Sequence, residues 1–384
     1  MKAVLSDVLV VDLSRVFAGP HCTMMLGDLG ATVIKVERPG KGDDTRHFGP
    51  PFTAGESAYY LGLNRNKKSV TLDFGTEEGK QQLLHLLEKA TVLVENFRPG
   101  VLERKGLGYE TLRAINPGLI YCSISAYGQV GSRSKMPGYD LVVQAQSGIM
   151  SVTGEIDGDP VPVGTPLNDI MAGTLACLSI LAALRVRDQT GLGQRIDNSL
   201  FEAGLSLLGN IASNHLISGA DAKRYGKGHA NIVPYQELHT RNGYIIIACG
   251  NDQLYTRLCH LLGCEDLATD ARFTTNGLRN QNRRELIAIL EGVLVQRDTE
   301  DWLKDLREAG IPCSPVQTVR EALSDVPVQE RGFIWECEHP TAGPIKLLGS
   351  PINLSDTPTR LYDAPPLLGE DNEWLSQFLE ENKQ

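Results

Sequence analysis

The segment GTPLND at 164–169 brings the carboxylate of Asp169 to the start of the apolar run 170–186. The length and composition of this run predict a helix. Asp169 stands where an N-cap residue belongs, and capping is one role that its position predicts. A chemical role fits the same position, because a helix N-terminus favours the ionised carboxylate and the Gly/Pro loop leaves room for a substrate. An ionised carboxylate can attack an activated acyl group, so both roles stay open.

Several cationic side chains follow the ends of predicted strands. Arg38 follows the strand Thr32–Glu37, and the segment NFRPG at 96–100 follows the strand Val92–Glu95, with Arg104 shortly after it. Open parallel sheets bind ligands outside the carboxyl ends of their strands, so these loops are expected to line one crevice. Arginine binds phosphate in a bidentate manner, and a helix start in this region would add backbone N–H donors. The alternative is that these arginines pair with surface carboxylates.

The motifs of several common enzyme classes are absent from the sequence. The first turn reads SRVFAGP at 14–20, without the G-x-G-x-x-G pattern of a dinucleotide site. Neither G-x-S-x-G nor a Walker A motif occurs, which argues against α/β-hydrolase and P-loop chemistry. The eight cysteines form no C-x-x-C pair and the eight histidines form no H-E-x-x-H pair. We therefore predict no metal site, and we expect free thiols in a reducing compartment.

Strands and helices alternate in the first part of the chain. The strand Val8–Leu13, the turn at 18–20, the helix His21–Leu29 and the strand Thr32–Glu37 form a βαβ unit, whose handedness rule implies a parallel sheet. The alternation continues with strands at Ser69–Phe74, Val92–Glu95 and Leu119–Ile124 and a helix at Thr76–Ala90. We therefore predict an α/β fold with an open, Rossmann-like parallel sheet and helices on both faces.

A change in the sequence pattern near Tyr225, from alternating strands and helices to a loop with Gly and Pro, predicts a second domain. Residues 1–210 are assigned to the large α/β domain, with a helix expected to begin within 197–210. The loop YGKGHANIVPY at 225–235 is punctuated by Gly and Pro, and a short strand and amphipathic helices follow it, so a smaller α/β domain is expected at 225–320. The Pro-rich segment 325–384, with a last helix from Asn372, is expected to return to the large domain.

Composition limits the class of protein. The 384 residues are 41% hydrophobic and 22% charged, which is typical of a globular chain of about two or three domains. The net charge of −10 argues against non-specific nucleic-acid binding. The apolar stretch 171–184 would span about 21 Å as a helix, short of a bilayer core of about 30 Å. No signal peptide is recognised, so we expect a cytoplasmic protein without a membrane anchor.

Long motifs carry a resemblance to a known family. They are VDLSRVFAGPHCTMMLGDLGATVIKVERPGKGDD, LNRNKKSVTLDF, VENFRPG, SAYGQVG, PGYDLVVQAQSG, PLNDIMAG and PLLGE. On these motifs the chain resembles the class III family of CoA-transferases, which includes formyl-CoA transferase and carnitine CoA-transferase. Within the family, GDDTRHFGPPF, ESAYYLGLNRNKKS and YGKGHANIVPYQ are most similar to the succinyl-CoA:glutarate-type dicarboxylate transferases.

The resemblance implies a catalytic aspartate at Asp169 and an interlocked homodimer. Coenzyme A enters as a substrate, and neither a tightly bound cofactor nor a metal is implied. The implied CoA contacts are Ala18, Arg38, Leu72, Asp73, Phe74, Asn96, Phe97, Arg98 and Arg104. The candidates for contact with the acids are Phe17, Tyr139, Asp140, His229 and Tyr235.

For several of these residues a purely structural role is an open alternative to contact with a substrate. Asp140 fits a structural turn at least as well as a contact with substrate, and His229 could merely order its loop. The cluster RNKK at 65–68 and Arg46 would bind CoA phosphates or the dicarboxylate, or else lie on the solvated surface. Backbone N–H groups near 18–19 or in the 225–235 loop are the candidates for stabilising an oxyanion.

Two departures from formyl-CoA transferase bear on the acyl group. Phe17 replaces a Gln of that enzyme, and its long Gly-rich loop is missing, so that the region around His229 and Tyr235 takes its place. Both departures argue against oxalate or formate. The implied reaction is CoA transfer from succinyl-CoA to a dicarboxylate such as glutarate through covalent aspartyl intermediates. The alternatives are an acyl-CoA racemase of the same fold, which needs a proton-transfer pair, and a non-catalytic acyl-CoA-binding protein.

Overall fold

The protein is described by a computed structural model covering residues 2–381, in which the chain divides into two compact units. The first unit is built from Met1–Ile149, Pro162–Leu208 and Val326–Gln384, apart from the undescribed end residues. The second unit is built from Met150–Val161 and Gly209–Asp325. Each unit is described by itself.

The first unit contains a six-stranded parallel sheet with the order β5-β2-β1-β6-β7-β8. Its strands are β1 (Leu9–Asp12), β2 (Thr32–Glu37), β5 (Lys67–Thr71), β6 (Val92–Glu95), β7 (Ile120–Ser125) and β8 (Arg195–Ser199). From β1 the chain adds β2 and β5 on one side of the sheet and then β6, β7 and β8 on the other side. In such a sheet the crevice outside the carboxyl ends of these two central strands is the expected ligand site. The open parallel sheet that the sequence predicted is confirmed.

Apolar side chains of alternate strand residues point to opposite faces of this sheet. Val10 joins a core with helices α1 (Ala18–Asp28) and α8 (Leu167–Thr190), whereas Val11 joins a core on the other face. The other core is formed with α3 (Glu77–Lys89), α4 (Val101–Arg104), α5 (Tyr109–Ile115) and α18 (Asn372–Glu381). Helices therefore cover both faces, as predicted.

The remaining short elements before α8 are η1 (Asp44–His47), β3 (Phe52–Thr53), β4 (Glu56–Ser57), α2 (Ala58–Leu61), α6 (Asp140–Gln146) and α7 (Ile149–Val152).

Two predicted elements of the first unit differ from the structure. The segment 195–199, read as leading into a helix from Asp197, is the edge strand β8, and helix α9 (Leu200–Leu207) begins only after it. Its RIDNS sequence contains one apolar residue, Ile196, and lies at a partly exposed edge of the sheet, so it lacks the apolar run of a buried strand. Strand β5 covers Lys67–Thr71 and not Ser69–Phe74, because two lysines at its start are carried in the sheet.

Helix α8 is longer than the apolar stretch that predicted it. Its 24 residues are long and apolar enough to cross a membrane by length and composition, and it is the one helix of the described chain that meets this test. A buried core helix meets the same test, and Ala172, Ala176 and Ile180 of α8 pack in the core against the sheet. The membrane expectation based on the 171–184 stretch therefore used too short a helix.

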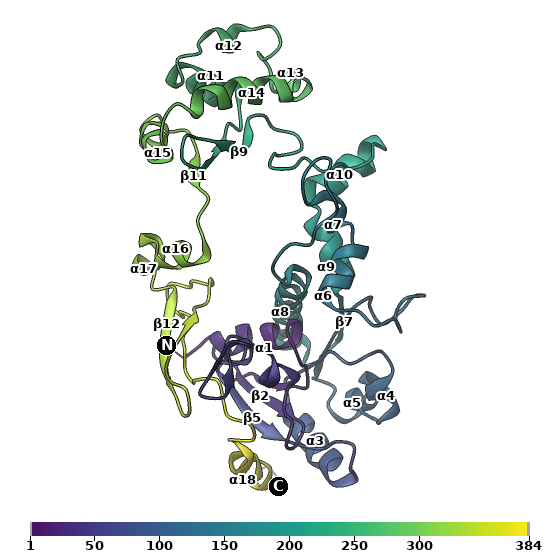
Figure 1. Cartoon of the computed structure of the whole chain (residues 1–384). Helices are drawn as coiled ribbons and strands as arrows, with labels where there is room; N and C mark the ends of the chain where they lie inside the picture. Colours follow the sequence, from purple (N-terminus) through teal and green to yellow (C-terminus); the bar gives the residue numbers. More distant parts are fainter. Residues whose placement is uncertain (1, 382–384) are drawn as a thin grey trace. The chain divides into compact units, whose positions relative to one another are not determined.

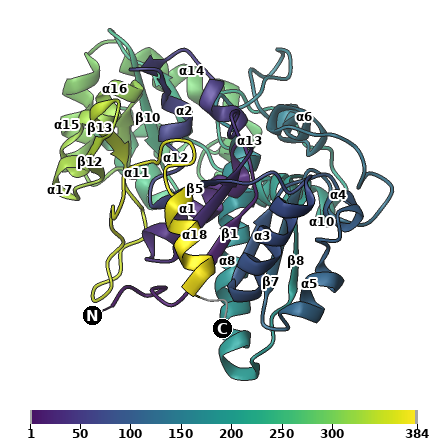
Figure 2. The same cartoon turned by 90° about the horizontal axis from the view of Figure 1, so that it is seen from below.

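The C-terminal part of the described chain contributes to the first unit. It contains α17 (Val326–Glu330), the hairpin β12 (Ile334–His339) with β13 (Gly343–Leu348), and α18. Helix α18, drawn in yellow, lies beside the edge strand β5 (Figures 1 and 2). Asp371 accepts a hydrogen bond from the backbone N–H of Ser69 at 2.9 Å, and Asn372 accepts one from Thr71 at 2.8 Å. These side chains satisfy the outer edge of the sheet.

The second unit is a smaller α/β structure with its own core. An antiparallel sheet of order β11-β10-β9 is formed by β9 (Tyr235–His239), β10 (Tyr244–Ala248) and β11 (Cys313–Pro315). Its helices are α10 (Gly209–Ser218), α11 (Asp252–Leu261), α12 (Asp266–Thr269), α13 (Asn276–Gln281), α14 (Arg283–Leu294), α15 (Thr299–Glu308) and α16 (Val319–Ser324). Leu238, Ile245 and Ile247 of the sheet pack with Leu286 and Leu290 of α14.

Candidate active site

A cavity of about 390 Å³ in the first unit is lined by Asp169. Four loop segments supply most of its walls, namely 15–18, 96–99, 124–126 and 136–139. Three of these segments follow or end the parallel strands β1, β6 and β7, and the fourth leads into α6. The cavity therefore lies at the carboxyl edge of the sheet, where the sequence predicted a ligand crevice.

Asp169 is the third residue of α8 and is partly buried. Pro166 occupies the N-cap position, and no side chain of the capping residue bonds the helix N-terminus. The expectation that Asp169 itself stands at the N-cap is wrong. The helix starts three residues earlier than expected because Pro166 fixes its own backbone and because leucine and asparagine extend the first turn.

The side chain of Asp140 caps α8 from another helix. Its Oδ1 atom accepts hydrogen bonds from the backbone N–H groups of Asn168 at 2.8 Å and Asp169 at 3.2 Å. Gln144, one turn later on α6, donates to Asp140 Oδ2 at 2.6 Å and accepts from the backbone N–H of Val163 at 2.9 Å. The pair therefore ties α6 to the first turn of α8, which carries Asp169, and to the loop before it. Asp140 acts on Asp169 through this backbone contact.

The pKa of Asp169 is shifted far from that of an exposed carboxyl group. Burial, and after it the negative charge of Asp140, raise the pKa of Asp169 to about 7. A helix N-terminus favours the ionised carboxylate, but desolvation and the like charge of Asp140 outweigh this effect. A pKa near 7 leaves about half of the Asp169 carboxyl groups ionised at pH 7. This value suits a carboxylate that acts first as a nucleophile and later as a leaving group.

Another wall of the cavity is formed by the loop after β1 and the start of α1. Arg15, Val16, Phe17 and Ala18 line the cavity, and Ala18 opens helix α1. Helix α1 packs closely on α8, since a Cβ atom on Gly173 would lie only 2.5 Å from the carbonyl oxygen of Ala18. Two helix N-termini, those of α1 and α8, are thereby brought to one cavity.

Aromatic rings adjoin this wall. Phe17 meets Tyr59 edge to face with ring centroids 5.9 Å apart, and Tyr59 meets Phe48 in the same way at 5.6 Å. Burial, and then the charges of Asp169 and Asp140, raise the pKa of Tyr59 to about 12, so its phenol keeps its proton. Tyr139, another predicted substrate contact, lines the cavity and is 72% exposed.

A second cavity of about 430 Å³ adjoins the first one. The two share Arg15, Phe97 and Val101 in their walls. The second cavity is lined by Leu13, Ser14, Lys35–Pro39, Lys41–Asp43, Leu72–Gly75 and Lys105 in addition. The predicted contacts Arg38, Leu72, Asp73, Phe74 and Phe97 are therefore brought together in one crevice. Cations, aromatic rings and exposed loop backbone in this crevice suit a phosphorylated nucleotide.

The remaining predicted CoA contacts are more dispersed. Ala18, Asn96 and Arg98 line the cavity of Asp169, whereas the exposed Arg104 lines neither of the two cavities. Asn96 serves the architecture, because its amide bonds both backbone polar groups of Arg15, at 2.9 and 2.7 Å. Arg104 lies one turn from Gly100, and its place near the crevice rests on the resemblance alone.

His229 and Tyr235 belong to the second unit. Their rings stack with centroids 5.2 Å apart and an interplanar angle of 7°. The backbone N–H of Asn231 donates to His229 Nδ1 at 3.1 Å, so in the neutral ring the proton sits on Nε2. Asn276 and Arg283 hold the carbonyl groups of Asn231 and His229 at 2.8 and 2.6 Å. The loop is thus ordered by side chains of α13 and α14.

Arg65 and Lys67 of the cluster RNKK form buried ion pairs. Arg65 forms a buried ion pair with Asp28 at 2.6 Å, and Lys67 is buried against Asp12 at 3.2 Å. Arg46 pairs with the buried Glu37 at 2.7 Å. Neither the binding role nor the solvated-surface role fits Arg65 and Lys67, because each is neutralised inside the sheet layer.

Sequence reasoning missed several residues of the two cavities. Arg15, which lies in both walls, and Lys41 in the second cavity carry positive charge toward the ligand space. Lys105, which follows the predicted contact Arg104 in the sequence, also lines the second cavity and stands over the ring of Phe74 at 5.5 Å. Their signal in the sequence was their position directly after strands β1 and β2 and in the loop that follows α4. Among the described residues, no group of three or more His, Cys, Asp or Glu side chains could hold a metal ion.

Comparisons with known proteins cover nearly the whole chain. The family model for CoA-transferase family III matches residues 5–372. The chain is 43% identical over 366 residues to succinyl-CoA:glutarate CoA-transferase of Homo sapiens, covering 95% of this chain and 84% of that protein. It is 39% identical over 352 residues to acetyl-CoA:oxalate CoA-transferase of Acetobacter aceti, covering 91% and 89%.

Solved structures agree with the fold. A CAIB/BAIF family protein from Brucella suis superposes with a TM-score of 0.87 at 42% identity, covering 99% of this chain and 100% of that one. A protein from Mycobacterium tuberculosis superposes with a TM-score of 0.86 at 33% identity, covering 97% and 98%.

Proposed function

The chain belongs to CoA-transferase family III, and from this premise we propose that it moves CoA from succinyl-CoA to a dicarboxylate such as glutarate through Asp169. The motif-based recognition of the family is confirmed. The observation that carries the proposal is the placement of Asp169 in a cavity that adjoins the crevice of Arg38 and Phe74. A thioester can therefore reach the carboxylate while its nucleotide occupies the crevice.

The proposed reaction begins at the thioester carbonyl. A carboxylate oxygen of Asp169 bonds to this carbon and the carbon–sulfur bond breaks. CoA leaves as a thiolate, and a mixed anhydride of succinate and Asp169 remains. The thiolate then attacks the aspartyl carbonyl, which releases succinate and leaves an aspartyl-CoA thioester. Dividing one difficult substitution into easier steps is the benefit of covalent catalysis.

The second half repeats these steps in reverse order. An acceptor carboxylate attacks the aspartyl thioester, which frees CoA thiolate and forms a new mixed anhydride with Asp169. The thiolate attacks the acceptor carbonyl, which yields the new acyl-CoA and the free aspartate. The thioester energy is retained throughout, so no nucleotide hydrolysis is needed.

Backbone donors at the start of α1 are our candidates for the oxyanion site. The first N–H groups of a helix have no acceptor within the helix, and those of Ala18 and Gly19 open this one. Ala18 and Asp169 line the same cavity, which favours this site over the 225–235 loop. Preorganised donors of this kind are worth about 3 kcal/mol each in other acyl-transfer sites.

Dicarboxylate specificity rests on relatives and on a few side chains. Relatives that are 43%, 39% and 37% identical carry the names succinyl-CoA:glutarate, acetyl-CoA:oxalate and succinyl-CoA:mesaconate CoA-transferase, respectively. Membership of the family therefore does not fix the acid. Phe17 and Tyr139 line the cavity of Asp169 and are our proposed acid contacts there. In the second unit, the Nε2–H of His229 beside Tyr235 is a donor suited to a carboxylate.

We also propose the homodimer that the family resemblance implies. Leu178 of α8 is 61% exposed, and Leu141 of α6 is 58% exposed. Apolar side chains at such exposure favour coverage by a second copy of the chain.

We also propose a cytoplasmic location. The eight cysteines are unpaired, which agrees with this proposal.

Trapping the covalent intermediate tests the proposal. Incubation with succinyl-CoA and no acceptor, followed by digestion and mass spectrometry, should show CoA on the peptide that contains Asp169. Asp169→Asn should abolish this adduct, whereas Asp188→Asn, an exposed carboxylate near the end of the same helix, should leave it intact. Absence of an adduct in the wild type would contradict the proposal.

The same samples separate the two alternatives. Solvent deuterium at the acyl α-carbon without an adduct would indicate a racemase, which needs a histidine or another base beside Asp169. Among the described residues that line the cavity of Asp169, none is a histidine. A non-catalytic binding protein would bind succinyl-CoA with equal affinity before and after Asp169→Asn and would form no adduct.

A further inference from the structure

Val16 holds an unusual backbone conformation in the wall of the Asp169 cavity. Its φ is +71°, in the left-handed region, although valine is branched at Cβ. For a β-branched residue this conformation is a true outlier that costs about 1–3 kcal/mol, so the surroundings must impose it. Phe17 and Ala18, which follow it directly, form the next part of the same wall.

Side chains of three residues, from β2 and from the loops after β2 and β6, fix the backbone at Val16. Lys35 donates to the carbonyl oxygen of Ser14 at 3.1 Å, and Asn96 bonds both backbone groups of Arg15. Asp43 accepts from the backbone N–H of Val16 at 3.3 Å. The backbone up to and including the N–H of the strained residue is therefore held by bonds from β2, from the loop after β6 and from the loop after β2.

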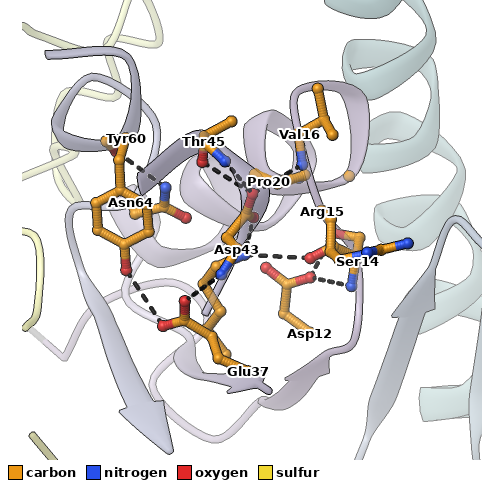
Figure 3. Close-up of polar contacts among 12 residues, drawn as sticks. Asp12, Ser14, Arg15, Val16, Pro20, Glu37, Asp43, Thr45, Tyr60 and Asn64 are labelled. Atoms are coloured by element: carbon orange, nitrogen blue, oxygen red, sulfur yellow. Dashed lines mark hydrogen bonds and ion pairs between the residues drawn. The ribbon is translucent and has the colours of Figure 1, made fainter. Parts of the chain in front are cut away.

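Asp43 is the centre of these contacts. Its carboxylate is buried and forms an ion pair with Lys35 at 2.8 Å, while Oδ1 also accepts from the backbone and hydroxyl groups of Thr45 at 3.0 and 2.8 Å. Its own N–H donates to Glu37 at 2.8 Å. Figure 3 shows Val16 and Thr45 approaching Asp43 from neighbouring segments, with Ser14 beside them.

The charges around Asp43 are paired, which makes its position rigid. Burial would raise the pKa of Asp43, but Lys35 and the bonds from Thr45 lower it well below its usual range. Lys35 also faces Asp12, which is buried and bonded to Lys67 at 3.2 Å. Removing one member would leave an unpaired charge in the sheet layer, so the network holds as a unit.

We propose that Asp43 is a positioning residue, which acts through the N–H of Val16 to hold the Phe17–Ala18 wall in place against Asp169. This proposal rests on the proposed function for its kinetic consequences. The use of valine, where glycine would adopt a positive φ freely, means that the network and not local preference sets this conformation. When the bond from Asp43 is weakened, Val16 relaxes toward negative φ and the wall moves. A shift of about 1 Å in such a wall can cost about 100-fold in rate.

The test combines Asp43→Asn with a rescue. Asp43→Asn keeps the size of the side chain but removes the charge that faces Lys35, and we expect kcat to fall about 10- to 100-fold, more than KM for succinyl-CoA rises. Adding Val16→Gly should recover about tenfold of this loss, because glycine adopts the required φ without the network. A purely structural role of Asp43 predicts no such recovery.

The matched control is Asp28→Asn, which disrupts another buried ion pair, that with Arg65, outside both cavities. It should lower the melting temperature as Asp43→Asn does but leave kcat of the folded protein within about twofold. Loss of kcat in this variant equal to that in Asp43→Asn would overturn the proposal.

A crystal structure of Asp43→Asn supplies a readout that is independent of activity. We expect a negative φ at residue 16 and a displaced Phe17. An unchanged positive φ would overturn the proposal, as would wild-type kcat in the variant or failure of Val16→Gly to restore any activity. If the wild type transfers CoA to none of the acids tested, the proposed function fails, while this structural comparison still decides the role of Asp43.

Discussion

Asp140 accepts a hydrogen bond from the backbone N–H of Asp169 at 3.2 Å while its charge disfavours ionisation of the Asp169 side chain. One carboxylate therefore has two opposite effects on the other. It fixes the first turn of α8, on which Asp169 stands, and it helps to raise the pKa of Asp169 to about 7. The same contact thus couples the geometry of the nucleophile to its protonation.

The first prediction concerns the pH dependence of adduct formation. Only the ionised form of Asp169 attacks the thioester, so the rate with succinyl-CoA should rise with pH up to about 7 and level off above it. Below pH 6 the rate should fall about tenfold per pH unit. Single-turnover measurements of adduct formation between about pH 5 and about pH 9 check this dependence, because this range covers both the rising and the level part of the curve.

Removal of the neighbouring charge should move this curve. In Asp140→Asn the midpoint should shift to lower pH, because burial alone then raises the pKa of Asp169. An unchanged midpoint would show that the charge of Asp140 has no influence on the nucleophile. Asp188→Asn, at the far end of α8, should leave the midpoint in place.

The second prediction concerns stability. The pKa of Asp169 is raised in the folded state, so from pH 3.8 to about 7 the carboxyl group ionises in the unfolded chain but keeps its proton in the folded protein. The free energy of unfolding therefore falls as the pH rises through this range. Asp169→Asn removes this cost. Its free energy of unfolding should exceed that of the wild type by an amount that grows by up to about 1.4 kcal/mol per pH unit from pH 4 to about 7 and is constant above that.

Denaturant titrations at several pH values measure this difference. At acidic pH, where Asp169 is protonated in both states, the two proteins should be equally stable. A difference that is constant from acidic to neutral pH would mean that the substitution acts through packing and not through charge.

The sheet and its ligand edge were predictable because their signals are local. Val8–Leu13 and Thr32–Glu37 are apolar runs separated by a turn, and the carboxyl ends of parallel strands necessarily meet at one edge. That reasoning placed Arg38 and Phe97 correctly in one crevice. The position of Asp169 at a predicted helix start left a capping role and a chemical role open, and the family motifs implied the catalytic one.

The buried charges were not predictable from local pattern. Lys35 and Lys67 look like solvated residues of strand ends, and only the fold shows that Asp43 and Asp12 neutralise them inside the sheet layer. Asp140 was predicted as a turn or a substrate contact, although it caps a helix 28 residues later in the chain. Ion pairs and caps between distant segments depend on tertiary structure, which spacing along the chain does not encode.

The third prediction concerns CoA binding. Arg38→Ala should raise KM for succinyl-CoA about tenfold, because a charge-assisted contact with a phosphate is worth about 1.5–3 kcal/mol. The effect should weaken as ionic strength rises, since Arg38 is exposed. Arg113→Ala, an exposed arginine of α5 outside both cavities, should leave KM unchanged.

Arg104 offers a sharper comparison for the same measurement. It lines neither cavity, although the family resemblance makes it a CoA contact. From its place in the structure, Arg104→Ala should raise KM less than Arg38→Ala does. An equal or larger effect would mean that the loop after β6 moves toward the nucleotide when CoA binds.

The fourth prediction concerns the contact between the two helices that meet at the cavity. In Gly173→Ala the new Cβ atom would lie 2.5 Å from the carbonyl oxygen of Ala18, a backbone atom that cannot move alone. Helix α8 must therefore shift away from α1, which should cost about 1–3 kcal/mol of stability. Because Asp169 lies one turn before Gly173, kcat should fall as well, by more than the loss of folded protein explains.

Gly164→Ala is the matched control, since no atom lies within 4 Å of its added Cβ and its stability and kcat should stay near wild type. Equal kcat in Gly173→Ala and Gly164→Ala, measured on folded protein, would show that the distance between α1 and α8 does not govern the reaction.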